Sequence, residues 1–196
     1  MTDFTVISKN LEAKGYHVSV FPTARQAALY LDQEINHMSV GFGGSMTLKS
    51  IGLWDLLHLH NTVYSHLDGY PFGPEAANAQ IYITSANGIA ETGEIVNIDA
   101  FGNRVAGSLF GHERVYFVIG RNKITPTCED AVQRARNIAA PKNAQRKKLS
   151  TPCALRGDRC YNCNSPDRIC CALLILWQAV QGMETEVVLV DEDLGF

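Results

Sequence analysis

The sequence lacks a hydrophobic segment long enough to cross a membrane. Its most apolar late segment, residues 169–180, is shorter than the roughly 20 residues that a spanning helix needs, and it contains Gln178. The first ten residues lack the long apolar core of a secretory signal peptide. No internal repeat or low-complexity linker is visible. These absences predict a cytoplasmic protein with no membrane span.

The sequence also lacks an excess of positive charge. Lysine and arginine number 17 against 20 acidic residues, which gives a formal net charge of −3. The one basic run, at 146–148, is short and is typical of a solvated helix end. A nucleic-acid-binding domain would carry a basic patch, so we expect no nucleic-acid partner. With 196 residues, of which 46 % are hydrophobic, the chain is expected to form one globular domain, 1–196.

Strands and helices are expected to alternate along most of the chain. Apolar runs typical of strands occur at 16–21, 38–42, 62–67, 81–84, 94–98, 114–119 and 186–190. Helical patterns occur at 4–14, 24–35, 45–57, 128–138 and 169–180, with Pro141 expected to end the fourth and a loop with one helical turn at 69–79. The alternation predicts an α/β fold, with a Rossmann-like, mostly parallel sheet and helices on both faces.

The stretch VGFGGSMTLKSIGL, at 40–53, passes from an apolar run through glycines into a helical pattern. Its glycines permit a sharp turn and a close approach to the backbone. A glycine-rich turn that enters a helix N-terminus favours a phosphate or a carboxylate. The candidate ligand-binding residues here are Gly43, Gly44, Ser45 and Thr47, with Ser45 as the expected helix cap. The P-loop and GxGxxG patterns are incomplete, and a tight connection that binds nothing is the alternative.

A polar segment, SANGIAETGEIVNIDAFGNRVAG at 85–107, follows the strand expected at 81–84. Its candidate ligand-binding residues are Asn87, Glu91, Asn97, Asp99, Asn103 and Arg104. Arg104 could bind a carboxylate or phosphate with its planar fork. Glu91 is the candidate catalytic residue, because a carboxylate near a strand end can be desolvated and tuned. The alternative is that these side chains satisfy the backbone of turns.

Both polar segments follow the ends of expected strands. Ligands of open parallel sheets bind outside the carboxyl ends of the strands. We therefore expect the glycine stretch and the segment 85–107 to line one crevice.

Four of the six cysteines follow the spacing C-x6-C-x2-C-x6-C within a cysteine-rich segment at 152–171. They are Cys153, Cys160, Cys163 and Cys170. Cytoplasmic thiols are not expected to form structural disulfides. Four soft thiolates suit a [4Fe–4S] cluster or a structural zinc ion, and Cys171 is a substitute candidate for the fourth ligand. A set of redox-active or merely buried thiols is the alternative.

Together these segments resemble the lactate-utilisation (LUD) domain family over nearly the whole chain. The stretches that carry the resemblance are VGFGGSMTL, SANGIAETGEIVNIDAFGNRVAG, VIGRNKI, AAPKNAQR, PCALRGDRCYNCNSPDRIC and LVDEDLGF. The fifth looks like the cysteine-bearing branch of the family. The resemblance implies a fold similar to the sugar-phosphate isomerase and CoA-transferase superfamily, in which the loop resembling 43–47 holds a phosphate or an anionic substrate.

The resemblance also implies a role in organic-acid metabolism, since members of the family take part in oxidising lactate to pyruvate with iron–sulfur partners. We expect a small carboxylate or phosphorylated metabolite at the glycine stretch, a [4Fe–4S] cluster at the cysteines, and an iron–sulfur or redox protein as partner. Two alternatives stay open: a non-catalytic assembly subunit with structural zinc, and an isomerase or acyl-transfer enzyme that uses Glu91. The oligomeric state stays open, and a homo-oligomer is one alternative.

Overall fold

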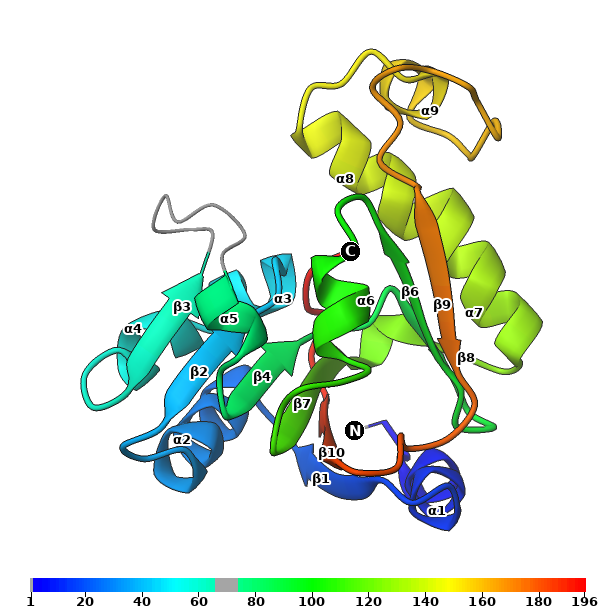
Figure 1. Ribbon diagram of the computed structural model, residues 1–196. Helices are drawn as coiled ribbons and strands as arrows, with labels where there is room; N and C mark the ends of the chain where they lie inside the picture. Colours follow the sequence, from blue (N-terminus) through cyan, green and yellow to red (C-terminus); the bar gives the residue numbers. More distant parts are fainter. Residues whose placement is uncertain (1, 66–73) are drawn as a thin grey trace.

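The computed structural model describes residues 2–65 and 74–196. At its centre lies a six-stranded sheet, in the order β1-β10-β7-β4-β2-β3, whose neighbouring strands all run parallel (Figure 1). These strands are β1 (His17–Phe21), β2 (Ser39–Phe42), β3 (Thr62–Ser65), β4 (Ile81–Thr84), β7 (Arg114–Gly120) and β10 (Glu184–Val190). The predicted Rossmann-like α/β fold with a parallel sheet is confirmed.

Helices flank the sheet and connect its strands. They are α1 (Thr5–Ala13), α2 (Ala24–Glu34), α3 (Met46–Ser50), α4 (Leu53–Leu57), α5 (Pro74–Ala77), α6 (Asn103–Gly107), α7 (Cys128–Arg134), α8 (Ala140–Arg146) and α9 (Pro152–Arg156). The helix expected at 45–57 is divided into α3 and α4 by Gly52, whose φ of +66° favours glycine. Within the described ranges, no helix has the length and apolar character that a membrane span requires.

The central strands are buried on both faces because alternate side chains point to opposite sides of the sheet. Tyr116 and Val118 of β7 pack with α2, α3 and α4 in one cluster. Val115, Phe117 and Ile119 of the same strand pack on the other face, with α1 and a second sheet. The continuous apolar run of β7 follows from this double burial.

The second sheet has four strands, in the order β8-β5-β6-β9, and was not expected from the sequence. Its strands are β5 (Gly88–Ala90), β6 (Ile95–Asp99), β8 (Ile124–Thr125) and β9 (Ala172–Leu176). The prediction of a helix at 169–180 is wrong. Residues 172–176 instead form β9, which pairs antiparallel with the open edge of β6. A short apolar run is compatible with either a strand or a buried helix. Here the free edge of β6 favours the strand, because it offers hydrogen-bonding partners to a neighbouring extended segment.

The helix that begins at Cys128 does not end before Pro141, so that prediction is wrong. A π-helical turn at Ala135–Ala139 joins α7 to α8, and Pro141 stands in the first turn of α8. A proline in a regular α-helix clashes with the carbonyl four residues earlier, whereas a wider turn relieves that clash. The strand expected at 62–67 is confirmed as far as Ser65. Residues 66–73, including the first five residues of the loop expected at 69–79, lie outside the described residues.

Candidate functional site

A pocket of about 210 Å³ lies at the carboxyl ends of β2, β4 and β7, three neighbouring strands of the large sheet. Its walls come from the glycine loop after β2, the segment after β4, the connection from β6 into α6, and α8. Lys123, Ala139, Ile169 and Phe196 also line it. The structure thus brings the two polar segments together in one crevice, at the edge of the sheet where ligands of such folds bind.

The glycine loop forms the turn between β2 and α3. A Cβ atom at Gly43 would lie 2.7 Å from Oγ1 of Thr84, so only glycine allows β2 to end this close to β4. Ser45 caps α3, since its Oγ accepts the N–H of Leu48 at 3.3 Å. Gly44, Ser45 and Thr47 line the pocket, whereas Gly43 packs beneath it.

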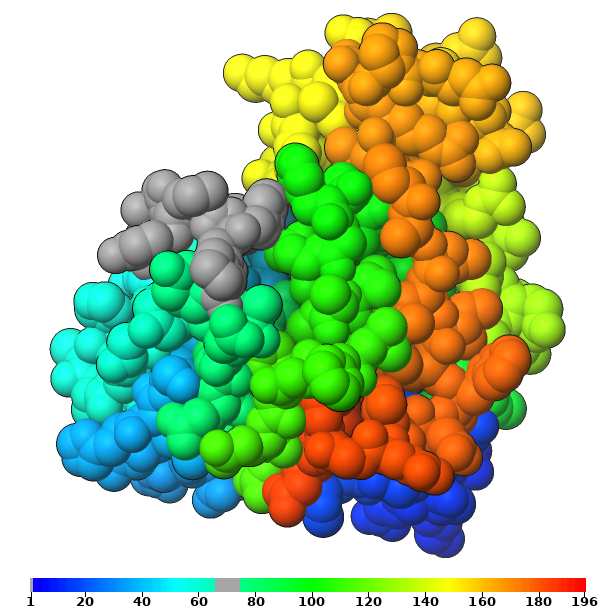
Figure 2. All heavy atoms as spheres, in the orientation of Figure 1, coloured from blue at the N-terminus to red at the C-terminus, as the bar shows by residue number. Residues whose placement is uncertain are grey.

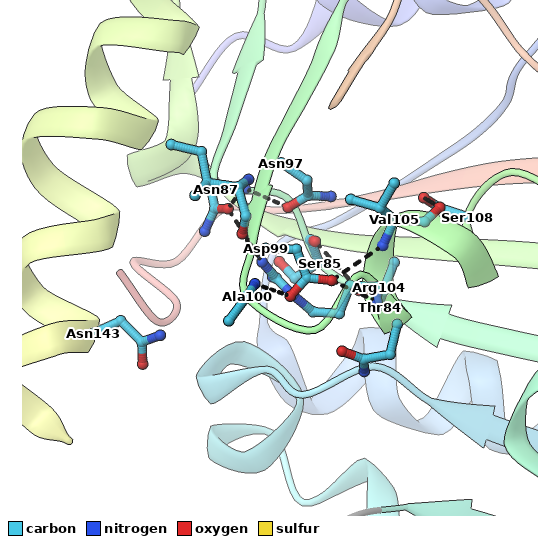
Figure 3. Close-up of polar contacts among 12 residues, drawn as sticks. Thr84, Ser85, Asn87, Asn97, Asp99, Ala100, Arg104, Val105, Ser108 and Asn143 are labelled. Atoms are coloured by element: carbon cyan, nitrogen blue, oxygen red, sulfur yellow. Dashed lines mark hydrogen bonds and ion pairs between the residues drawn. The ribbon is translucent and has the colours of Figure 1, made fainter. Parts of the chain in front are cut away.

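The wall from β6 into α6 is held by Asp99 and Arg104 (Figure 3). Oδ2 of Asp99 accepts the backbone N–H groups of Arg104 at 2.8 Å and Val105 at 3.3 Å, two donors at the start of α6 that have no partner within the helix. The Arg104 guanidinium donates to the Ile98 carbonyl and to Oδ1 of Asn87, and its Nε lies 3.7 Å from Oδ1 of Asp99. The pocket is lined by four of the six residues expected in this segment: Asn87, Asp99, Asn103 and Arg104.

Asn97 and Glu91 do not line the pocket. Asn97 is buried, and its Oδ1 accepts the N–H of Asn87 at 3.1 Å, so it positions a lining residue from behind. Glu91 lies in the turn between β5 and β6 with its side chain exposed. Its backbone N–H donates to Thr125 and its carbonyl accepts from Asn10 of α1. This position gives Glu91 no contact with the pocket.

The sequence reasoning missed Lys123, which lies at the pocket with only 3 % of its surface exposed. Its Nζ donates to Oγ1 of Thr47 at 2.7 Å and to Oγ of Ser85 at 2.9 Å. Burial lowers the pKa of Lys123 to about 7, with smaller contributions from Arg134 and Arg104. Lys123 follows the end of β7, so the strand-end argument used for the other two segments would have found it.

The lining is strongly cationic. Among the described residues, its basic side chains are Lys49, Arg104, Lys123, Arg146 and Lys147, whereas its carboxylate side chain is Asp99. Arg146 and Lys147 belong to the run at 146–148, which was expected to be a solvated helix end. Both are exposed at the end of α8, and both also line the pocket. Asn143 extends from the same helix toward this space (Figure 3).

The cysteine segment forms a projecting lobe between α8 and β9 (Figures 1 and 2). All of its cysteines are free thiols. The N–H of Asn162 donates to Sγ of Cys160 at 3.3 Å. Arg168 donates to the carbonyls of Cys163 at 2.6 Å and Cys170 at 2.9 Å, and so links the central pair to the last of the four cysteines.

The four expected ligands lie close enough for their charges to interact. Burial, followed by neighbouring thiols, raises the pKa of Cys170 to about 11. Those neighbours are Cys160, Cys153 and Cys163. Cys171 is exposed instead. Four thiols suit a soft metal by their chemistry, but within ranges 2–65 and 74–196 no group of three or more His, Cys, Asp or Glu residues stands in metal-ligating geometry.

The lobe is joined to the pocket at the start of β9. The N–H of Cys171 donates to the carbonyl of Asp99 at 2.9 Å. Ile169, one residue before Cys170, lines the pocket. The pocket and the cysteine lobe therefore share a wall.

A family model of the LUD domain matches residues 5–190. Among solved structures, the chain is similar to a DUF162 family protein from Deinococcus radiodurans, with 15 % sequence identity and a TM-score of 0.55, covering 97 % of this chain and 99 % of that chain. At this identity the similarity shows the fold alone. No curated protein matches the chain. Because the family model matches nearly the whole sequence, the chain belongs to the LUD domain family.

Proposed function

We propose that the pocket binds a small organic anion, either a carboxylate or a phosphorylated metabolite of organic-acid metabolism. The observation that supports this is the charge of the lining: among the described residues, Lys49, Arg104, Arg146 and Lys147 are cationic, Lys123 is partly protonated near neutral pH, and the carboxylate side chain is that of Asp99. The Asp99 carboxylate is already hydrogen-bonded within the protein, because each of its two oxygens accepts a backbone N–H group. A small, partly desolvated site with unbalanced positive charge favours an anion.

The cysteine lobe is the second part of the proposal. Cys153, Cys160, Cys163 and Cys170 would hold a [4Fe–4S] cluster, and zinc is the alternative metal. The proximity of Cys153, Cys160 and Cys163 to Cys170, whose pKa they help to raise, and the N–H donated to Cys160 support this reading, since hydrogen bonds to sulfur are a feature of such sites. A bound cluster would supply one-electron transfer, and an iron–sulfur or redox protein would be the partner.

The pocket proposal is tested by calorimetric titration with lactate, pyruvate and phosphate, with lactamide as the uncharged control. We expect at least one anion to bind and lactamide not to bind. Arg146→Gln should weaken binding because it removes a cation from the lining. Lys142→Gln is the matched control on the same helix, since Lys142 is exposed and does not line the pocket. Equal effects of the two variants, or no binding of any anion, would refute the proposal.

The cluster proposal is tested by measuring iron, sulfide and zinc in anaerobically purified protein, together with a visible spectrum. About four irons and four sulfides per chain are expected. One zinc per chain without iron would replace the redox role with a structural one. Absence of both metals would refute a metal site.

A further inference from the structure

Lys123 has a hydrogen-bonding arrangement that leaves one position of its amine open. The hydroxyl of Thr47 donates to the Leu194 carbonyl at 3.2 Å, and that of Ser85 donates to the Val118 carbonyl at 2.6 Å. Both hydroxyl hydrogens are thereby used, so both oxygens face Nζ as acceptors. A neutral amine satisfies them with its two N–H groups and retains its lone pair.

The surroundings of Lys123 favour this neutral form. Burial removes water from the ammonium group, and the nearby guanidinium groups of Arg134 and Arg104 repel its charge. The pKa of Lys123 accordingly falls to about 7, so the neutral amine is well populated near neutral pH. A desolvated lysine next to other cations is a typical amine nucleophile.

We propose that Lys123 forms an imine with the carbonyl carbon of a 2-oxo acid bound in the pocket. The inference rests on the proposed anion binding, and it narrows the ligand class to anions that carry a ketone or an aldehyde next to the carboxylate. The lining cations would hold the carboxylate, and the buried amine would meet the neighbouring carbonyl. The Thr47 and Ser85 hydroxyls, 2.7 and 2.9 Å from Nζ, are placed to pass protons.

The step balances without a further reactant. The Nζ lone pair forms a bond to the carbonyl carbon while the C=O π electrons move to oxygen, which gives a carbinolamine. The C–O bond then breaks, and the nitrogen electrons form the C=N bond. Both hydrogens of the neutral amine leave with that oxygen as water, so no oxidant or reductant is needed.

The test is reductive trapping of the whole protein with pyruvate and sodium cyanoborohydride, followed by peptide mass mapping. We expect the reduced adduct on Lys123 ahead of the exposed Lys49 and Lys142, despite the burial of Lys123. Lactate, which has no ketone, should give no adduct. An excess of lactate should reduce labelling at Lys123 but not at Lys142.

Calorimetric titration with pyruvate separates this inference from the proposed function. Binding of pyruvate without an adduct on Lys123, or with adducts only on exposed lysines, overturns the imine proposal but not the proposal that the pocket binds an anion. No binding of any anion and no adduct on Lys123 overturns both. The labelling is mapped in the wild-type protein, so the result does not depend on how a Lys123 variant folds.

Discussion

Lys123 is held by two hydroxyl groups rather than by a carboxylate, and this distinguishes it from most buried lysines. Its pKa falls from 10.5 to about 7 on folding, chiefly because of burial. Between these two values the unfolded chain binds the proton and the folded chain does not, so this residue makes stability rise with pH. Below about pH 7 both states bind the proton, and the full penalty of burying the charge is present.

Lys123→Met should therefore stabilise the protein more at pH 6 than at pH 10. At about 1.4 kcal/mol per pKa unit, the difference between the two pH values is expected to be several kcal/mol. Denaturant unfolding of variant and wild type at both pH values measures it. Lys49→Met is the control, because an exposed ammonium stays solvated in both states. The same stability difference at pH 6 and pH 10 would show that Lys123 is not buried as described.

Cys170 and Cys171 are neighbours with different surroundings. Cys170 is partly buried near the other three candidate ligands, whereas Cys171 is exposed and its Sγ donates to the carbonyl of Arg168 at 3.6 Å. Cys170→Ser should lower the metal content of anaerobically purified protein severely, while Cys171→Ser should leave it near the wild-type value. Loss of metal in Cys171→Ser with retention in Cys170→Ser would reverse the assignment.

Residue-scale features were predicted from the sequence where they depend on local contacts. Ser45 caps α3 as expected, and Thr23 caps α2 in the same way, because a cap needs only the N–H three residues later. The position of Glu91 was not predictable in this way, because the sequence did not reveal that residues 88–99 form a hairpin with Glu91 at its turn. The low pKa of Lys123 depends on burial by segments far apart in sequence.

At the scale of elements, the segment after β10 closes one side of the pocket. Leu194 is buried, and its N–H donates to Oδ1 of Asn122 at 3.0 Å. A Cβ atom at Gly195 would lie 2.6 Å from Oγ1 of Thr47 and 3.5 Å from Nζ of Lys123. Glycine is thus required where this segment meets the site.

Gly195→Ala should lower the affinity for the anion by about tenfold, which corresponds to about 1.4 kcal/mol. The reason is that the added methyl group displaces Thr47, and with it the support of Lys123. Gly52→Ala is the matched control, because the φ angles are similar, +64° and +66°, and a Cβ at Gly52 meets no atom within 4 Å. Both variants should lose similar backbone stability, but only Gly195→Ala should lose affinity. Equal affinities would contradict the role given to this segment.

The elements that the sequence failed to predict are those whose form depends on a neighbour. The run at β9 becomes a strand because β6 offers an unpaired edge, and its own pattern does not reveal that edge. Pro141 continues a helix because the preceding π-helical turn makes room for it. The central strands were predictable because burial on both faces requires a continuous apolar run, which is visible in the sequence.

At the scale of the whole molecule, the large sheet places three strand ends around one pocket and the cysteine lobe extends from its wall (Figure 1). The convergence of the polar segments was predictable from the rule that ligands bind at the carboxyl ends of parallel strands. The contribution of α8 to the pocket lining was not predictable, because it depends on a helix that continues past Pro141. The formal net charge of −3 did not indicate the cationic pocket, because a sum over the whole chain does not show where the charged residues lie.

The most direct test of this account is a crystal structure of anaerobically purified protein grown with a saturating concentration of pyruvate. We expect the anion between Ser45, Arg146 and Lys123, and a metal cluster held by the four cysteines of the neighbouring lobe. An anion bound elsewhere on the surface, with the cationic pocket containing only water, would contradict the central claim.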